Sequence, residues 1–354
     1  ASASPGDSII FNDNEVVTLA YGNYTGYFKY FEAKRNDITL TGGTTNYGFR
    51  AYGFSGSGID SIIAKVDITE NIIRMNGSST LYGMYLYYLN NDASDPGIVR
   101  NNMIYATNAN STTNYGFYTY HLSNVQFYHN SVHIDGGSTS ARAMYLSGST
   151  STTVFTAGNV DIRNNIFANY GPGQSIYVTG IADDGGYFIG LNNNLHYTNG
   201  TDMAYYGGNI ADLAAWQTAT GFAQNSVFGD PLFVGGGDLH VLGLPANDAG
   251  DNSVGVTFDI DGDSRPMMGS TTVDIGADEY APATCFPPSN ITVVNATSTS
   301  VILSWGAGSP NGPLYYGYEY DTTGFILGTG TQDSTLNTTL TITGLSPQST
   351  YDFY

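Results

Sequence analysis

The stretch Gly83-Met84-Tyr85-Leu86-Tyr87 decides the fold, because variants of it recur along the first half of the chain. Its apolar residues alternate with polar or tyrosine residues, and this period of two is typical of strands. A second motif, an asparagine followed by apolar residues, recurs between the copies. Two interleaved motifs with one shared period predict a solenoid, whose thin repeats bury their apolar faces against one another. The other copies of the stretch are residues 48–52, 116–120, 143–147 and 175–179.

The asparagine motif sets the length of the repeat. Successive asparagines lie 31, 28, 35 and 29 residues apart, and such variation is expected where strands keep their length and the loops between them do not. We therefore predict a β-helix with one coil per repeat. Its asparagines are expected to share one corner and to bond their neighbours in adjacent coils, a structural role favoured over a catalytic or ligand-binding one. These residues are Asn71, Asn102, Asn130, Asn165 and Asn194.

The composition favours an all-β extracellular protein of more than one domain. The 354 residues include 45 Gly and 29 Tyr, and only 11% are charged, so good helix formers such as Lys and Glu are scarce. A net charge of −20 argues against nucleic acid and anionic membrane surfaces as partners, although the acidity can equally serve solubility. No apolar run is long enough to span a membrane, and Ala1 is interpreted as the start of a mature or trimmed chain.

Four motifs follow the repeats. They are Gly229-Asp230-Pro231-Leu232-Phe233, Asp238-Leu239-His240, residues 259–266 (D-I-D-G-D-S-R-P) and residues 274–280 (D-I-G-A-D-E-Y). In this order they resemble the C-terminal closing segment of secreted bacterial right-handed parallel β-helix proteins of the pectin-lyase-like superfamily. The resemblance covers about residues 8–281 when the repeats are included, and it implies a right-handed coil. Residues 209–226, which contain Trp216, predict a short helix among the last coils.

A different set of motifs lies beyond a boundary near Pro282: residues 301–305 (V-I-L-S-W), 316–320 (Y-G-Y-E-Y) and 345–353. These motifs resemble a fibronectin type III domain, which implies a β-sandwich with Trp305 in its core and a tyrosine corner at Tyr351. The segment falls short of the ~100 residues that such a sandwich needs, so we expect further domains of a longer chain. We predict a β-helix over residues 1–281 and an incomplete fibronectin type III-like domain over residues 282–354.

Cys285 is the single cysteine of the chain. An odd cysteine in an extracellular protein suggests a partner outside the given sequence, and similar surface modules carry a cysteine just before the first strand of the sandwich. We expect a disulfide between Cys285 and a residue beyond Tyr354. A free buried thiol is the alternative.

Catalytic motifs are scarce. Polysaccharide lyases on this fold resemble one another in placing calcium ligands and a Lys or Arg base on one outward face, and glycoside hydrolases use clustered Asp residues with Gly-His-Gly and Arg-x-Lys. The chain has ten Lys and Arg in all and neither motif. Asp183-Asp184 is interpreted as a solvated loop rather than a catalytic pair. The five histidines show no spacing tied to a carboxylate cluster, so we assign no catalytic residue, although the fold permits an enzyme.

The outward positions of the repeated strand carry tyrosine. Alternation places Phe49, Met84, Phe117, Met144 and Ile176 inside and directs two columns of side chains outward. At ~4.8 Å strand spacing such columns would form a flat platform on which sugar rings stack. The alternative is that the aromatic side chains only cover the coil and bind no ligand. Lys29 and Phe31 are expected to extend the columns, and Lys29 with Arg50 favours an anionic glycan. The candidate ligand-binding residues are Lys29, Arg50, Tyr85, Tyr87, Tyr118, Tyr120, Tyr145 and Tyr177.

Asp259, Asp261 and Asp263 are candidate calcium ligands, because they alternate around Gly262. This spacing can bring three carboxylates to one Ca²⁺ ion, but the twelve-residue calcium loop is incomplete because Ser270 stands at its last position. A turn held by Asp caps and by Arg265 is the favoured interpretation. No other cofactor is indicated.

Taken together, the motifs predict a secreted or cell-surface β-helix that serves as an adhesive or structural segment and binds a polysaccharide or cell-surface glycan. Two alternatives stay open: a lyase or hydrolase with the coil as catalytic domain, and a passive spacer or secretion cargo. An enzyme needs an acid and a base within reach of one sugar bond, whereas an adhesin needs only aromatic and polar groups.

Overall fold

The chain forms two compact units, Ala1–Tyr280 and Ala281–Tyr354. The computed structural model describes residues 6–26, 28–42, 45–53, 64–77, 79–108, 113–148, 156–181, 186–280, 288–306, 316–326 and 328–354.

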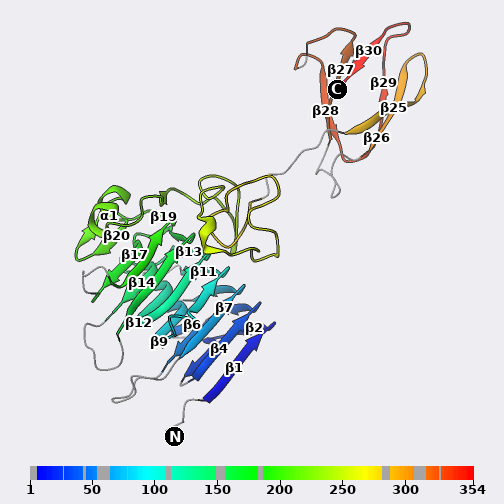
Figure 1. The fold of residues 1–354 in the computed structure, drawn as a ribbon. Helices are drawn as coiled ribbons and strands as arrows, with labels where there is room; N and C mark the ends of the chain where they lie inside the picture. The colour runs from blue at the N-terminus through cyan, green and yellow to red at the C-terminus, as the bar shows by residue number, and fades with distance from the viewer. Residues whose placement is uncertain are drawn as a thin grey trace. The chain divides into compact units, whose positions relative to one another are not determined.

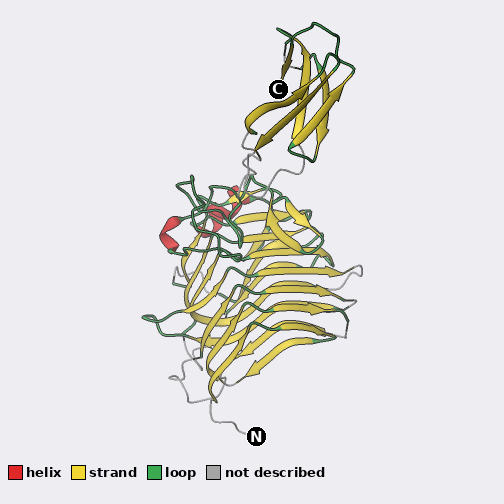
Figure 2. Cartoon of the chain, turned by 90° about the vertical axis from the view of Figure 1, so that its right-hand side faces the viewer, coloured by secondary structure: helices red, strands yellow, loops and turns green. Residues whose placement is uncertain are grey.

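The first unit is a parallel β-solenoid with three rows of strands (Figures 1 and 2). Strands of successive coils pair in parallel within each row, as β6 (Thr45–Tyr52) does with β9 (Thr80–Asn90). The strand β12 (Asn114–Tyr128) belongs to two rows. Its first part pairs with β9, and its last part pairs with β15 (Gly158–Arg163). The predicted fold class is therefore confirmed.

We name each row after its first strand. The β1 row contains β1 (Gly6–Asn12), β4 (Phe28–Lys34), β7 (Lys65–Thr69), β10 (Gly97–Arg100), the end of β12, β15 and β18 (Phe188–Asn192). The β2 row contains β2 (Glu15–Thr18), β5 (Asp37–Leu40), β8 (Ile72–Asn76), β11 (Met103–Asn108), β13 (Ser131–Gly136), β16 (Ile166–Asn169), β19 (Leu195–Thr198) and β22 (Val227–Phe228). The β3 row contains β3 (Tyr21–Gly26), β6, β9, the start of β12, β14 (Arg142–Ser147), β17 (Gln174–Thr179) and β20 (Ala204–Tyr206).

Inward side chains of the three rows form one apolar core. Phe49, Met84 and Phe117 occupy matching positions of the β3 row and are fully buried, as the alternation predicts. The residue before each of them is a glycine. A Cβ on Gly83 would lie 2.5 Å from the carbonyl oxygen of the next such glycine, so these coils approach one another closely only because the position lacks a side chain.

The corner between the β1 row and the β2 row carries the asparagine ladder. Each side-chain amide except the last donates a hydrogen bond to the Oδ1 of the asparagine in the next coil, at 2.7 to 3.0 Å. The amide of the last member, Asn194, donates to the Ile162 carbonyl oxygen at 2.8 Å. The residue before each asparagine has φ between 51° and 60°, a left-handed bend that turns the chain from one row into the next. The ladder consists of Asn14, Asn36, Asn71, Asn102, Asn130, Asn165 and Asn194.

The last coils contain the short helix expected within residues 209–226. It is α1 (Leu213–Thr220), whose N-terminus is capped by Asp212 and whose Trp216 is buried in the solenoid core. The preceding strand β21 (Asn209–Ile210) pairs antiparallel with β20. α1 therefore lies beside the C-terminal end of the β3 row.

The closing segment, residues 229–280, folds back over the outward side of the β2 row. It contains β23 (Phe233–Gly235), β24 (Asp238–Val241) and the 3₁₀ turn η1 (Asn252–Val254). The backbone N–H of Ala277 donates to Ser131 Oγ at 2.9 Å, and Leu239 packs with Ala277 against Met103. Apolar outward residues of this row, such as Met103, Ile166 and Leu195, are buried because the closing segment covers them.

The second unit is a β-sandwich. One sheet has the order β25 (Ser289–Ala296), β26 (Ser300–Gly306), β29 (Thr339–Thr343), and the other has the order β28 (Thr331–Thr335), β27 (Tyr316–Thr322), β30 (Tyr351–Phe353). Trp305 packs against the core residues Val301, Leu303 and Ile342. The Tyr351 hydroxyl accepts a hydrogen bond from the backbone N–H of Ser346 at 2.9 Å, which is the tyrosine corner.

Candidate functional site

The outward side of the β3 row carries a first column of tyrosines, formed by Tyr85, Tyr118, Tyr145 and Tyr177 in register. Neighbouring rings are nearly parallel, with centroids 4.6 to 5.4 Å apart. Tyr205 adds a further ring at one end, 4.3 Å from Tyr177. The four predicted residues of this column therefore lie together on one face.

The second column consists of Tyr52, Tyr87 and Tyr120, whose rings stack with centroids 5.1 and 4.5 Å apart. Ser147 and Thr179 continue this column in the register of the row. The aromatic part of the second column is thus shorter than that of the first.

A third column was not anticipated from the sequence. It comprises Tyr21, Tyr47, Tyr82 and Tyr115, with stacked rings 4.8 to 5.3 Å apart, and it ends at Arg142. Its rings meet the first column edge to face, as Tyr82 meets Tyr118 with centroids 5.4 Å apart. The signal that could have found it is a tyrosine directly before the repeat glycine at Gly48, Gly83 and Gly116.

Lys29 and Phe31 do not belong to this face. Both lie on β4, which pairs with β1 and β7 in a different row, and Phe31 is fully buried in the core. The strand that precedes β6 in the β3 row is β3, whose Tyr24 lies beside Arg50. The expected extension of the columns by Lys29 is therefore wrong.

The expected flat platform of exposed ring faces is also wrong. Because the rings stack along each column and meet edge to face between columns, most ring faces are covered by other tyrosines, and the side chains are only partly exposed. Burial raises the pKa of Tyr82 to about 12 and also raises the pKa of Tyr85 and Tyr118. The surface therefore offers neutral hydroxyl groups and ring edges.

Two arginines lie among the tyrosines. The guanidinium of Arg50 lies 4.6 Å from the ring centre of Tyr24 and 5.3 Å from that of Tyr85. The guanidinium of Arg142 lies 4.7 Å from the ring centre of Tyr177 and donates to the Thr139 carbonyl oxygen at 2.7 Å. The strands of the β3 row contain no Asp or Glu, so these strands contribute positive but no negative side chains to this face.

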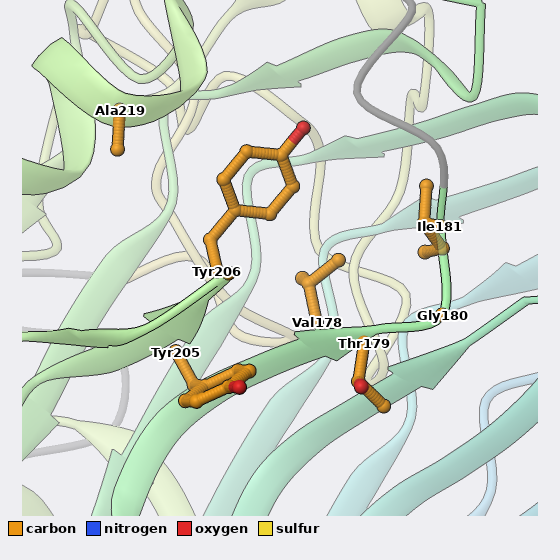
Figure 3. Close-up of a pocket in the computed structure, with 8 residues that line it drawn as sticks. Val178, Thr179, Gly180, Ile181, Tyr205, Tyr206 and Ala219 are labelled. Atoms are coloured by element: carbon orange, nitrogen blue, oxygen red, sulfur yellow. The ribbon is translucent and has the colours of Figure 1, made fainter.

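A pocket of about 280 Å³ lies where the columns end (Figure 3). Tyr205, the last ring of the first column, lines it together with Thr179 from the second column. The ring of Tyr206 lies between Ala219 of α1 and Ile181 in the view of Figure 3, and it meets the ring of Trp216 edge to face with centroids 6.1 Å apart. The pocket combines an aromatic wall with backbone and hydroxyl groups. Its remaining lining residues are Val178, Gly180 and Gly207.

The predicted calcium ligands are not brought together. The buried carboxylate of Asp259 accepts hydrogen bonds from the backbone N–H groups of Asp261, Asp263 and Glu279 at 2.8 to 3.0 Å. Arg265 is buried and donates to Glu279 at 2.7 Å. The motif forms a capped turn joined to the end of the closing segment, as the favoured interpretation states.

One histidine does approach carboxylates, contrary to the sequence interpretation. His240 faces Asp238 with Nδ1 and Asp261 with Nε2. Potential ligand atoms of His240, Asp261 and Asp278 all lie within 4.8 Å of one another, which is the one such group among the described residues. No local spacing could reveal it, because its members are 21 and 17 residues apart.

Other predicted residues fall elsewhere. The five predicted asparagines lie in the buried ladder, where their amides serve one another and the backbone. Asp183, Asp184 and Cys285 lie outside the described residues.

Comparison with known proteins bears on the second unit. Residues 286–354 match the fibronectin type III domain family, whereas a search of curated proteins found no match. No described helix is long and apolar enough to cross a membrane. A solenoid with such a domain fits a structural or adhesive extracellular protein, since fibronectin type III domains are common in that setting. The second unit is a fibronectin type III β-sandwich.

Proposed function

We propose that the chain is an adhesive or structural segment of a secreted or cell-surface protein and that the tyrosine face of its solenoid binds a polysaccharide or cell-surface glycan. The resemblance of the closing motifs to secreted bacterial β-helix proteins supports the same setting. The observation that carries the proposal is the set of three stacked tyrosine columns leading to the pocket at Tyr205 and Tyr206.

The face suits an extended, hydroxyl-rich ligand. Tyrosine hydroxyls can donate and accept hydrogen bonds, and in columns they recur at the strand spacing of ~4.8 Å. The rings are held by their neighbours, so little side-chain entropy is lost when a ligand binds. A glycan would run along the columns and insert one sugar into the pocket, whose lining includes the rings of Tyr205 and Tyr206.

Charge favours an anionic glycan over a neutral one. Arg50 and Arg142 supply two positive charges, and the strands of the row supply no carboxylate. The acidity of the remaining chain would repel an anionic polymer from other surfaces and so restrict it to this face.

Paired substitutions test the proposal. In the double variant Tyr118→Phe and Tyr145→Phe, the stacked rings remain while two hydroxyls are lost, so glycan-array binding should weaken several-fold without loss of fold. A double Tyr118→Ala and Tyr145→Ala variant should weaken binding further, with some loss of stability because stacked partners disappear.

Tyr197→Phe is the matched control, because Tyr197 lies on β19 outside the tyrosine face and its hydroxyl donates to Asn199. Glycan binding that is unchanged in both double variants, or lost equally in the control, contradicts the proposal. Release of unsaturated or reducing-end sugars by the unaltered chain would instead favour the enzyme.

A further inference from the structure

We propose that His240, Asp261 and Asp278 bind a divalent transition-metal ion of the zinc type. The three residues come from three separate motifs of the closing segment: His240 from β24, Asp261 from the capped turn and Asp278 from the last stretch. The inference is independent of glycan binding, because the cluster lies over the β2 row and the tyrosine columns lie on the β3 row.

Backbone hydrogen bonds hold the ligands in place. Asp259 ties the backbone of Asp261 to that of Glu279, the neighbour of Asp278, through its two carboxylate oxygens. The backbone N–H of Val241, next to His240, donates to Asp278 Oδ2 at 2.9 Å. All three side chains are therefore brought together by the fold of the segment, and only the exposed Asp261 side chain has to move for an ion to bind.

The orientation of His240 points to an ion at Nε2. Its Nδ1 faces the Asp238 carboxylate, while its Nε2 lies 2.6 Å from Asp261 Oδ2. At this hydrogen-bond distance a proton lies between Nε2 and Asp261. A zinc ion, which binds nitrogen and oxygen ligands at about 2 Å, would replace that proton and move the exposed Asp261 carboxylate slightly outward. Histidine ligands of zinc commonly donate the other ring N–H to a carboxylate, and Asp238 is placed for that role.

The charge balance favours a divalent cation. Asp238, Asp261 and Asp278 carry three negative charges against one ring. The positive charge of Arg74, on β8 of the underlying β2 row, acts on Asp238, and Arg265 is already paired with Glu279. A divalent ion offsets this excess better than a single proton does.

The ligand set selects the metal. One imidazole nitrogen with two carboxylates suits zinc and leaves a fourth position for water, whereas calcium and magnesium prefer oxygen ligands alone. Asp278 is 8% exposed, while the Asp261 side chain is 54% exposed, so solvent can deliver the ion from one side.

Zinc titration of the tag-free full chain, after removal of bound metals with a chelator, tests the site. We expect one zinc ion per chain, a rise in the thermal midpoint on zinc addition, and d–d absorption bands of low coordination number when Co²⁺ replaces zinc. Asp261→Asn should abolish saturable binding, and Asp238→Asn should weaken it about ten- to a hundredfold.

Asp263→Asn is the control, since Asp263 is exposed in the same turn but outside the ligand group. The proposal is overturned if the unaltered chain shows no saturable zinc binding, if Asp261→Asn binds as the unaltered chain does, or if Ca²⁺ binds more tightly than zinc. A proton alone would then hold His240 between its carboxylates. Because the cobalt spectrum is recorded on the unaltered chain, the test does not depend on the folding of a variant.

Discussion

One side chain in the asparagine ladder serves several partners at once. The Asn130 amide donates to Asn165 Oδ1 at 2.8 Å and to the Val99 carbonyl oxygen at 2.9 Å, and its Oδ1 accepts from the Asn102 amide at 2.8 Å. We expect Asn130→Ala to lower the free energy of unfolding by about 1–3 kcal/mol, because buried partners lose their hydrogen bonds. Chemical denaturation measures the change, and Asn76→Ala, at an exposed position, should leave stability nearly unaltered. Equal free energies of unfolding for the two variants would show that the asparagine ladder does not stabilise the solenoid.

Local composition decided which ladder members could be predicted. Asn14 and Asn36 were missed because Glu15 and Asp37 follow them, which hides the pattern of an asparagine before apolar residues.

The third tyrosine column was missed for a different reason. Strict alternation from the buried Phe49 directs Tyr47 inward, but Gly48 is also buried, and this break in the period turns the tyrosine outward.

A strand of the β3 row depends on the absence of one methyl group. A Cβ at Gly83 would lie 2.4 Å from Ile104 Cγ2 and 2.5 Å from the Gly116 carbonyl oxygen. We expect Gly83→Ala to cost about 1–3 kcal/mol of stability, because neither the core side chain nor the paired backbone can move away freely. Thermal and chemical unfolding check this, with Gly208→Ala as the control, since nothing lies within 4 Å of a Cβ there. A variant as stable as that control would show that the coils can separate at this position.

The closing segment marks the limit of prediction from periodic sequence. Rows of strands were predictable because each coil repeats the same alternation, and the helix α1 was predictable as an interruption of it. The contacts of His240 with Asp261 and Asp278 join irregular stretches far apart in the sequence, and only the folded backbone brings them together. The four motifs of the closing segment indicated a resemblance to known β-helix proteins, but they did not show which of their side chains lie close together.

Charge is distributed unevenly over the molecule. The chain carries 30 Asp and Glu against 10 Lys and Arg, yet the strands of the tyrosine row contain none of the acids. Strands of the β1 row instead pair acids with bases, as Lys34 pairs with Asp67 at 2.7 Å. The strands of this row therefore contribute two arginines and no carboxylate to one extended surface of an acidic protein.

We expect the buried residue His196 to make the solenoid less stable in acid. His196 is fully buried between Phe167 and Trp216, its Nδ1 lies 3.0 Å from Ser175 Oγ, and burial lowers its pKa to about 4. The unfolded chain binds a proton at this residue below pH 6.5, whereas the folded chain does so only near pH 4. Folding is therefore penalised as the pH falls from 6.5 to 4, by about 1.4 kcal/mol per pH unit.

Comparison of the unaltered chain with His196→Phe isolates this effect. Buried acids titrate in the opposite sense, since burial raises the pKa of Asp274 to about 7 and so favours the folded chain as the pH falls. Their contribution is the same in both chains and cancels in the difference. We expect the stability of the unaltered chain, measured by chemical denaturation relative to the variant, to decline steadily from pH 6.5 to 4 and to level off above pH 7. Two parallel curves over that range would mean that His196 does not stay neutral in the folded solenoid.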